Sequence, residues 1–296
     1  MRAERLEQVD PMLKQFLKDL VSEMVQEFND EIVSMALFGS GATKEWIKGK
    51  SDIDFIVVIK DEKLKKKVED SIDQILIKVD KKHNLKLTQT CCTFIKHKNP
   101  LVNFLYRLEY ILTFGKPFFV FSVKELEFEK GTIANAQVRF LTSIFDPLVI
   151  FLAKMKQTGV TIYGQNLIEK INYTVTPLEK VRIAIAPLWI VFMSIISFPL
   201  DHQFALSHAI KSTLWACEDS LFAMDQSLSS TKDEIQLILD IFGENINIEH
   251  LNLTLELKKK TIEKTTSKGF VAKYILNTIG FILKLYFKTG DANKKK

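Results

Sequence analysis

Apolar residues recur along the first part of the chain with two different periods. Over Pro11–Phe28 they fall every three or four residues, which predicts an amphipathic helix. Two short apolar runs, Ile32–Phe38 and Phe55–Ile59, are bounded by glycine or polar residues and are rich in branched and aromatic side chains, as buried strands are. The lysine-rich segment Glu62–His83 returns to the helical period, and predicts a crossover helix with a charged outer face.

The middle of the chain continues this alternation of elements. Leu85–Ile95 alternates along its length and contains β-branched residues, so we expect the third strand of the same sheet there. We expect a helix over Pro100–Leu112. A longer helix is predicted over Val138–Lys156, which has apolar residues at helical spacing and is followed by a stop at Thr158-Gly159.

The pattern becomes almost wholly helical after Thr176-Pro177, where proline suits the first turn of a helix. Only Ile246–Leu257 alternates as a strand does. Four segments have the helical period: Leu178–Phe198, Phe204–Gln226, Lys232–Phe242 and Phe270–Lys288. We therefore expect an all-α bundle in the C-terminal part.

One segment of this bundle is apolar enough to raise the question of a membrane. Ile183–Leu200 contains eighteen residues without a charge, which is near the lower limit for a span. Pro187 and Pro199 interrupt it, however, and Arg182 lies beside it. We expect a buried central helix of the bundle rather than a membrane span.

Composition fits a protein of the cytoplasm. The 296 residues leave room for two domains, and 47% are hydrophobic and 26% charged. The first residues form no signal peptide, and the three cysteines, Cys91, Cys92 and Cys217, have no metal-ligand spacing. We expect a cytoplasmic protein with structural cysteines.

Positive charge is concentrated at the C-terminal end of the chain. The net charge is +5, but residues 257–296 hold eleven lysines against two acidic residues. A basic segment of this kind is open to nucleic acid, anionic lipid or phosphorylated substrates. We favour a solvated helix face, because the charge comes from lysine and not from arginine, the residue suited to bidentate phosphate or base contacts.

Candidate chemistry lies between the first two predicted strands. Gly39-Ser40-Gly41 follows the first of these strands. Glycines let backbone N–H groups approach an anion, and a helix that began after the turn would direct its positive end toward that anion. Asp52 and Asp54 lead into the second strand, where alternate side chains share a face and Ile53 turns into the core. Two neighbouring carboxylates suit Mg²⁺, especially when substrate phosphates complete its shell.

This stretch resembles the signature of the DNA polymerase β-like nucleotidyltransferase superfamily. The signature has a hydrophobic residue before Gly-Ser, then a spacer, then Asp-hydrophobic-Asp-hydrophobic; here these are Phe38-Gly39-Ser40 and Asp52-Ile53-Asp54-Phe55. The similarity is to the branch that includes aminoglycoside and minimal nucleotidyltransferases. In that branch a helix ends in glycine, and a short strand that finishes in Tyr-Gly closes the domain. The segment Gly159–Leu167 resembles this, since Tyr163-Gly164 follows an apolar stretch within it.

The resemblance implies an α+β fold. A small mixed sheet flanked by helices is followed by an all-α helical bundle. It implies a nucleotidyltransferase domain over residues 1–172, with its core at 32–122 and a connecting segment to 172, and a helical domain over 173–296. In this reading Asp52 and Asp54 are the catalytic and Mg²⁺-binding residues. Nucleotide-binding residues are Gly39, Ser40, Gly41 and Lys44.

The chain departs from the family pattern at two places. Related proteins carry a third carboxylate on the third strand, whereas the corresponding positions here are Thr88, Gln89 and Thr90. Glu109, in the predicted helix Pro100–Leu112, is open to two interpretations, a substitute for this acid or a surface residue. Lys44 stands where relatives often have glycine, and is open to two interpretations, a phosphate contact or the exposed first turn of a helix.

Two functions are compatible with these residues. The first is a Mg²⁺-dependent enzyme that transfers a nucleoside monophosphate from a nucleoside triphosphate, ATP by expectation, to a hydroxyl of a small molecule or protein. The second is a catalytically weak or inactive binding module of the same fold, such as one member of a toxin–antitoxin-like pair. A homodimer is compatible with both functions.

Overall fold

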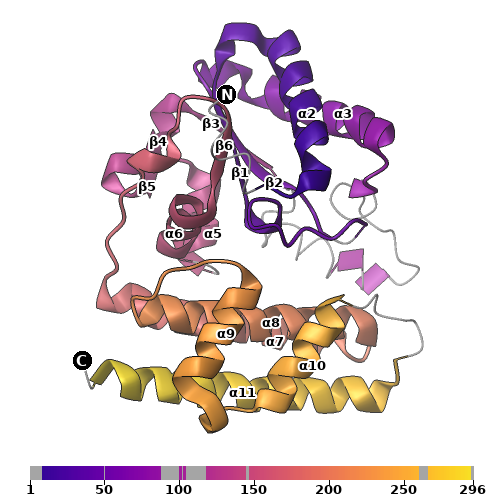
Figure 1. Ribbon diagram of the computed structural model, residues 1–296, viewed down its shortest axis with the longest axis vertical. Helices are drawn as coiled ribbons and strands as arrows, with labels where there is room; N and C mark the ends of the chain where they lie inside the picture. Colours follow the sequence, from indigo (N-terminus) through magenta and orange to yellow (C-terminus); the bar gives the residue numbers. More distant parts are fainter. Residues whose placement is uncertain are drawn as a thin grey trace. The chain divides into compact units, whose positions relative to one another are not determined.

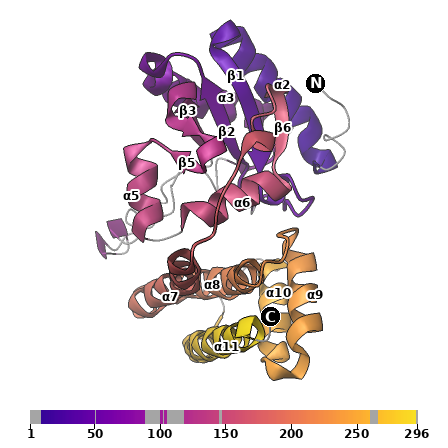
Figure 2. The ribbon, with the colours of Figure 1, turned by 90° about the vertical axis from the view of Figure 1, so that its left-hand side faces the viewer.

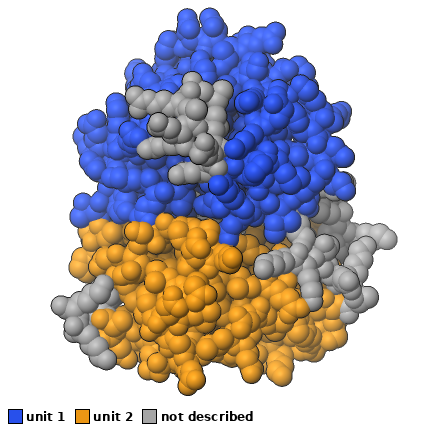
Figure 3. Space-filling model, viewed as in Figure 1, with its two compact units in different colours: residues 1–95, 108–144, 151–174 blue, residues 96–107, 145–150, 175–296 orange. Residues whose placement is uncertain are grey.

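The computed structural model describes residues 9–49, 51–87, 100–101, 103–104, 118–144, 147–259 and 266–294 (Figure 1). The chain divides into two compact units, shown in different colours in Figure 3. The N-terminal unit comprises residues 1–95, 108–144 and 151–174, and the C-terminal unit comprises residues 96–107, 145–150 and 175–296. The predicted domain boundary at residues 172–173 stays a prediction.

A four-stranded mixed sheet forms the centre of the N-terminal unit. Its strand order is β3-β2-β1-β6, with β1 antiparallel to both β2 and β6 and β2 parallel to β3. The bounds are Ile32–Phe38 for β1, Asp54–Ile59 for β2, Phe118–Ser122 for β3 and Val160–Gly164 for β6. The strands predicted at 32–38 and 55–59, and the short strand ending in Tyr-Gly, are confirmed.

Helices α2 (Pro11–Phe28) and α3 (Lys65–His83) cover one face of the sheet (Figures 1 and 2). Leu13, Phe16 and Leu20 of α2 pack into one core with the inward residues of the strands. Both helices match their predicted positions, since α2 begins at Pro11 behind the Asp10 cap and α3 ends at the left-handed Asn84. Their apolar stripes are therefore the faces that the sheet buries.

The opposite face of the sheet is covered by α6 (Leu148–Thr158). The ring of Phe151 on α6 meets Phe38 of β1 and Phe119 of β3 edge to face, at centroid distances of 5.7 and 5.6 Å. Because β2 is covered on both faces, it is apolar at every position after Asp54. This explains the unbroken run Phe55–Ile59 in the sequence.

The predicted helix Val138–Lys156 is wrong as a single element. The structure has α5 (Ala136–Ile144) and then α6, with Pro147 directly before α6. Proline has no backbone N–H and disfavours helical backbone in the residue before it, so a helix does not run through this position unbroken. Leu85–Ile95, predicted as a strand, is described only at residues 85–87, which are not in a strand.

A hairpin follows β3 and is tied to α3 by an ion pair. It consists of β4 (Leu126–Glu127) and β5 (Thr132–Ile133). The ammonium of Lys65 donates to both carboxylate oxygens of Glu125, at 2.8 and 3.0 Å. Burial alone would raise the pKa of Glu125, but the hydrogen bonds from Lys65, the Ser122 backbone N–H and the Asn135 amide outweigh it and lower the pKa.

Short 3₁₀ helices join these elements. They are η1 (Asn29–Glu31), η2 (Gly39–Gly41), η3 (Glu62–Leu64), η5 (Val123–Glu125), η6 (Phe128–Lys130), η7 (Ile168–Lys170) and η8 (Gly243–Asn245).

The C-terminal unit is a helical bundle built around α8. The helices are α7 (Pro177–Ser197), α8 (His202–Ala223), α9 (Thr231–Phe242), α10 (Ile248–Lys259) and α11 (Lys268–Lys294). Helix α8 packs against each of the other four, and most of its side chains are buried. The all-α bundle is confirmed. Thr176 and Glu179 form a capping box before Pro177, where a helix start was predicted.

The alternation of Ile246–Leu257 indicates a strand, but the structure has a helix there. Most of that segment lies in α10, where His250, Leu251 and Thr254 are buried together against the bundle. These three positions lie on one helical face, at spacings of one to four residues. Packing against α8 and α11 therefore overrides the local alternation of Leu and polar residues.

The expectation that Ile183–Leu200 forms the buried central helix of the bundle is wrong. This segment lies mostly in α7, which is at the surface on one side. One face packs inward through residues such as Ile183, Ala186 and Val191, while the opposite face is exposed and apolar. Helices α7 and α11 are both long and apolar enough to cross a membrane by length and composition, as core helices of soluble proteins also are. The carbonyl of Pro187 accepts a hydrogen bond of 2.6 Å from Ser212 of α8.

A buried polar network links α8, α10 and α11. His250 Nε2 lies 3.2 Å from the hydroxyls of both Thr213 and Thr278, and the hydroxyls of Thr254 and Tyr274 are 2.6 Å apart. Burial lowers the pKa of His250 to about 4 from an ordinary 6.5, because a charged ring loses its hydration there. The folded chain therefore holds His250 neutral.

This network predicts acid sensitivity. Because the unfolded chain protonates His250 near pH 6.5 and the folded chain only near pH 4, the free energy of unfolding should fall as the pH drops through this window. The loss attributable to His250 is at most about 3 kcal/mol. Urea unfolding of wild type and His250→Gln between pH 7 and 4 measures it. The variant should show a shallower pH dependence; equal slopes would contradict the assignment.

Candidate nucleotide-binding site

The candidate site lies at the edge of the sheet where β1 ends and β2 begins. In the antiparallel register Phe38, the last residue of β1, is opposite Asp54, the first residue of β2. The turn Gly39–Gly41 leaves β1 at this point. Antiparallel pairing thus brings the glycine turn and the acidic residue together, although fourteen positions separate Ser40 from Asp54.

The carboxylate of Asp54 lies directly against the backbone of Gly39. A Cβ atom added to Gly39 would be 2.5 Å from Asp54 Oδ2, so the Asp54 carboxylate would have to move away from the turn. Gly39 also has φ of +66°, in the left-handed region that favours glycine. Glycine satisfies both requirements without strain and without displacing the acid, so its place before Ser40 has a steric cause in the folded site.

Asp52 lies two residues before β2 and is exposed. Between the two acids, Ile53 is 1% exposed and belongs to the core shared by the sheet and the helices α2 and α3. The buried Ile53 anchors the chain here. Asp52 and Asp54 therefore flank one core residue at the edge of the sheet, and Asp54 is half-buried there.

The glycine turn is held from behind by the start of α2. The backbone N–H of Asp10 donates to the Gly41 carbonyl at 3.3 Å. A Cβ atom at Gly41 would lie 3.1 Å from Leu13 Cδ1, so the turn packs closely on this helix. Sequence reasoning missed Asp10 and Leu13, because no local pattern connects them with a turn about thirty residues later.

The turn itself is closed by local hydrogen bonds. The N–H groups of Ala42 and Glu45 donate to the carbonyls of Gly39 and Ser40, both at 3.1 Å. Residues 42–49 contain turns and irregular backbone but no α-helix, so no helix N-terminus faces the turn from this segment. The anion-binding capacity of this segment therefore rests on the backbone of the turn and on Ser40.

Lys44 lies in this irregular segment and is exposed, with φ of +62°. The interpretation that it occupies the first turn of a helix is thereby excluded. Lys44 lies four residues after Ser40 in the chain.

The third acid expected in the family is not settled by the described residues. Thr88, Gln89, Thr90 and Glu109 all lie outside them. Glu125 follows the carboxyl end of β3, and because β3 runs parallel to β2 it lies at the far end of the sheet from Asp54. Glu125 is therefore excluded as a partner of Asp54.

His208 is buried in the bundle, where its Nδ1 lies 2.9 Å from the Phe204 carbonyl.

The residues at this edge fit a Mg²⁺ ion that is shared with a nucleotide. Within the described ranges no group of three or more histidine, cysteine, aspartate or glutamate side chains gathers as a complete metal cage. Mg²⁺ is commonly held by one or two carboxylates, with substrate phosphates and water completing its shell. Asp52 and Asp54 supply hard oxygen ligands of this type, beside a turn without side-chain bulk.

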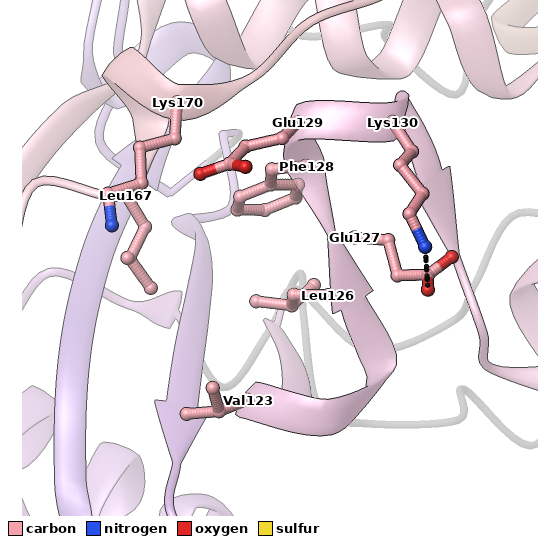
Figure 4. A pocket seen from close by; sticks show the side chains of 8 residues that line it. All are labelled: Val123, Leu126, Glu127, Phe128, Glu129, Lys130, Leu167 and Lys170. Atoms are coloured by element: carbon pink, nitrogen blue, oxygen red, sulfur yellow. Dashed lines mark hydrogen bonds and ion pairs between the residues drawn. The ribbon is translucent and has the colours of Figure 1, made fainter.

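A separate pocket opens at the other end of the sheet (Figure 4). Its lining combines apolar side chains with an ion pair of 2.9 Å between Lys130 and Glu127. The lining residues are Val123, Leu126, Glu127, Phe128, Glu129, Lys130, Leu167 and Lys170. Because Val123 follows the carboxyl end of β3, this pocket is distinct from the edge that carries Asp54.

Comparison with known proteins agrees with this location. Residues 17–111 match the model of a family described as "Nucleotidyltransferase domain". The fold is similar to that of the spectinomycin adenyltransferase AAD(9) from Enterococcus faecialis, solved with ATP and spectinomycin. The TM-score is 0.50 at 14% identity, over 91% of this chain and 98% of that one. No curated protein sequence matches.

These observations define the class of protein. The mixed sheet places a glycine turn after β1 and an acid at the start of β2, within the residues that match the family model. Residues 17–111 match a nucleotidyltransferase domain, which supports the resemblance to the DNA polymerase β-like nucleotidyltransferase superfamily, and a helical bundle follows this part of the chain.

The contact between Gly39 and Asp54 predicts the effect of one added methyl group. Gly39→Ala should lower stability by about 1–2 kcal/mol from the left-handed backbone alone, and should also displace the Asp54 carboxylate. Gly280→Ala is the matched control, because a Cβ atom there meets nothing within 4 Å and alanine is the better helix former. Thermal unfolding measures both variants. Gly39→Ala as stable as wild type would contradict the geometry.

Proposed function

We propose that this protein is a Mg²⁺-dependent nucleotidyltransferase. It moves a nucleoside monophosphate from a nucleoside triphosphate to a hydroxyl group of an acceptor. The observation that carries the proposal is the position of the Asp54 carboxylate against the backbone of Gly39, within a segment that matches the nucleotidyltransferase family. A phosphate-binding turn and a metal-binding acid are the two parts that such a transfer requires at one place.

The residues of this edge have distinct roles in the proposed reaction. Ser40 and the backbone of Gly39 and Gly41 bind the β- and γ-phosphates, and exposed Lys44 adds positive charge beside them. Asp52 and Asp54 would hold Mg²⁺, which would neutralise phosphate charge and stabilise the charge that develops at the α-phosphorus. The acceptor oxygen forms a bond to the α-phosphorus as the bond to pyrophosphate breaks.

We propose ATP as the donor and a small molecule as the acceptor. The structure of similar fold was solved with ATP and spectinomycin, which supports both choices. A protein hydroxyl is the other acceptor that this scaffold suits.

A second function is a binding module that has lost chemistry. The observation that favours it is the sequence Thr88-Gln89-Thr90, which has no acid at the positions where relatives place their third carboxylate. Without that acid, removal of the proton from the acceptor hydroxyl requires another base. Retention of both Asp52 and Asp54 favours the enzyme, because two acids at one edge repel each other unless a cation binds there.

Nucleotide binding should stabilise the folded chain. ATP with Mg²⁺ binds only the folded state, so the melting temperature should rise with ligand concentration. Ser40→Ala should reduce this rise in part, and Asp52→Asn should remove the part that requires Mg²⁺. Differential scanning fluorimetry with ATP alone, Mg²⁺ alone and both together separates these contributions. A transition that no nucleotide moves would favour a module without a nucleotide site.

Catalysis should depend on both acids as one unit. Asp52→Asn or Asp54→Asn removes an electrostatic contact of the reacting phosphate, which typically costs about 3–4 kcal/mol, or several hundred-fold in rate. Transfer of label from α-³²P ATP to an acceptor measures this loss. The double variant should be scarcely slower than either single variant.

Asp30→Asn is the matched control for this experiment. Asp30 is exposed and precedes β1, so it lies at the end of that strand opposite the site. This variant should transfer label at the wild-type rate. If wild type transfers no label to any acceptor and still binds ATP with Mg²⁺, the binding-module function replaces the enzyme.

A further inference from the structure

Helix α7 presents a continuous apolar stripe to solvent. Its residues recur every three or four positions, so they lie along one side of the helix. The α7 stripe consists of Leu178 (69% exposed), Val181 (56%), Ile185 (46%), Trp189 (44%), Phe192 (49%) and Ile196 (40%). The rings of Trp189 and Phe192 pack edge to face at 6.0 Å. A soluble chain rarely exposes so long an apolar surface without a partner.

The opposite side of α7 is firmly held by the bundle, so the stripe is a surface feature of an anchored helix. Ile183, Ala186 and Val191 are buried, and Ser212 of α8 donates a 2.6 Å hydrogen bond to the Pro187 carbonyl. Helix α7 packs against both α8 and α11 (Figure 2). Turning the stripe inward would therefore break an existing core.

The spacing of the stripe is symmetric about its middle. Counted from the midpoint between Ile185 and Trp189, those two residues lie two positions away on either side. Val181 and Phe192 lie six and five positions away, and Leu178 and Ile196 lie nine positions away on either side. An antiparallel copy of α7 would therefore place every residue of the stripe opposite another apolar residue. A two-fold axis requires this self-complementarity.

The exposed apolar area of the α7 stripe approaches the area that stable protein–protein interfaces bury on each partner. The stripe offers roughly 600 Å² of apolar side-chain area per chain, taking full side-chain areas of about 150–250 Å². Stable interfaces bury about 800 Å² per partner, a value that the neighbouring half-exposed side chains would bring within reach. No charged residue lies between Ile183 and Leu200 to oppose the contact.

A second copy explains this surface better than a lipid bilayer does. Helices that lie on membranes flank their apolar face with lysine and arginine, which reach the lipid headgroups. On α7 the basic residues are confined to the first turns, at Lys180 and Arg182, and the Lys180 ammonium pairs with Asp225 at 3.3 Å; from Ile183 to Ser197 the helix has no lysine or arginine, and its other face is occupied by protein. Symmetry of the stripe has no role at a membrane surface.

We propose that two copies of this chain form a homodimer through antiparallel packing of their α7 stripes. The two-fold axis passes near the level of Pro187, and Trp189 and Phe192 supply the aromatic centre of the interface. Aromatic side chains of this kind commonly carry most of the binding energy at an interface.

The mass of the full chain in detergent-free buffer tests the proposal. Light scattering after gel filtration should give twice the 34.1 kDa of one chain. The double variant Trp189→Glu, Phe192→Glu should be monomeric, because it places charges in the centre of an apolar contact. Ile241→Glu on α9 is the matched control: its side chain is 40% exposed in the same unit, and this variant should remain dimeric. Circular dichroism should show unchanged helicity in all three.

Engineered cysteines test the antiparallel arrangement. In a chain with Cys91 and Cys92 replaced by serine, Val181→Cys with Phe192→Cys should form disulfide-linked dimers on mild oxidation. Each single cysteine should not, because antiparallel packing separates equivalent residues by roughly 17 Å along the helix. A disulfide requires Cα atoms within about 7 Å.

Three results would overturn the proposal. One is a monomeric wild type at every concentration tested. Another is a dimer that persists in the Trp189→Glu, Phe192→Glu variant, which would place the interface elsewhere. The third is a monomer that sediments with vesicles of phosphatidylcholine and phosphatidylglycerol through the same stripe, which would make the surface a membrane-binding face. None of these results bears on nucleotide transfer at Asp54.

Discussion

The structure of the candidate site depends on the close approach of the Asp54 carboxylate to the backbone of Gly39. The antiparallel register of β1 and β2 sets this approach, because Phe38 lies opposite Asp54 and the chain turns immediately afterwards. Gly39 permits it, because its φ is +66° and a Cβ atom would collide with the acid. The start of α2 supports it from behind through Asp10 and Leu13. A shift in any of these three elements would separate the acid from the turn.

Sequence alone predicted the parts of this fold that local chemistry determines. The strands at 32–38 and 55–59 and the helix Pro11–Phe28 have matching patterns and boundaries, because periodicity, proline and capping residues act within a few positions. Prediction from the sequence was wrong or incomplete where contacts between residues far apart in the chain determine the structure. Ile246–Leu257 alternates like a strand but is buried as a helix against α8 and α11, and the support of Gly41 by Leu13 has no local signal. The break within Val138–Lys156 does have a local signal, because Pro147 lies directly before α6. The helical period alone predicts one continuous helix there and misses this break.

The C-terminal unit shows the same limit in another form. An uncharged segment such as Ile183–Leu200 indicates burial, but composition does not indicate what buries it. In the structure one side of α7 packs on the bundle and the other presents Trp189 and Phe192 to solvent. The central position belongs instead to α8, which the sequence did not distinguish from its neighbours. Burial inside one chain and burial between two chains leave the same pattern in the sequence, and only the fold separates them.

The central claim is that the glycine turn and the two acids form one site for a nucleotide and its metal. A crystal structure of the full chain with a non-hydrolysable ATP analogue and Mg²⁺ tests it most directly. The account predicts the β- and γ-phosphates against Gly39, Ser40 and Gly41, with Mg²⁺ about 2.1 Å from an oxygen of Asp54 and of Asp52. A nucleotide bound elsewhere on the chain, or a metal bound to its phosphates without either acid, would contradict it.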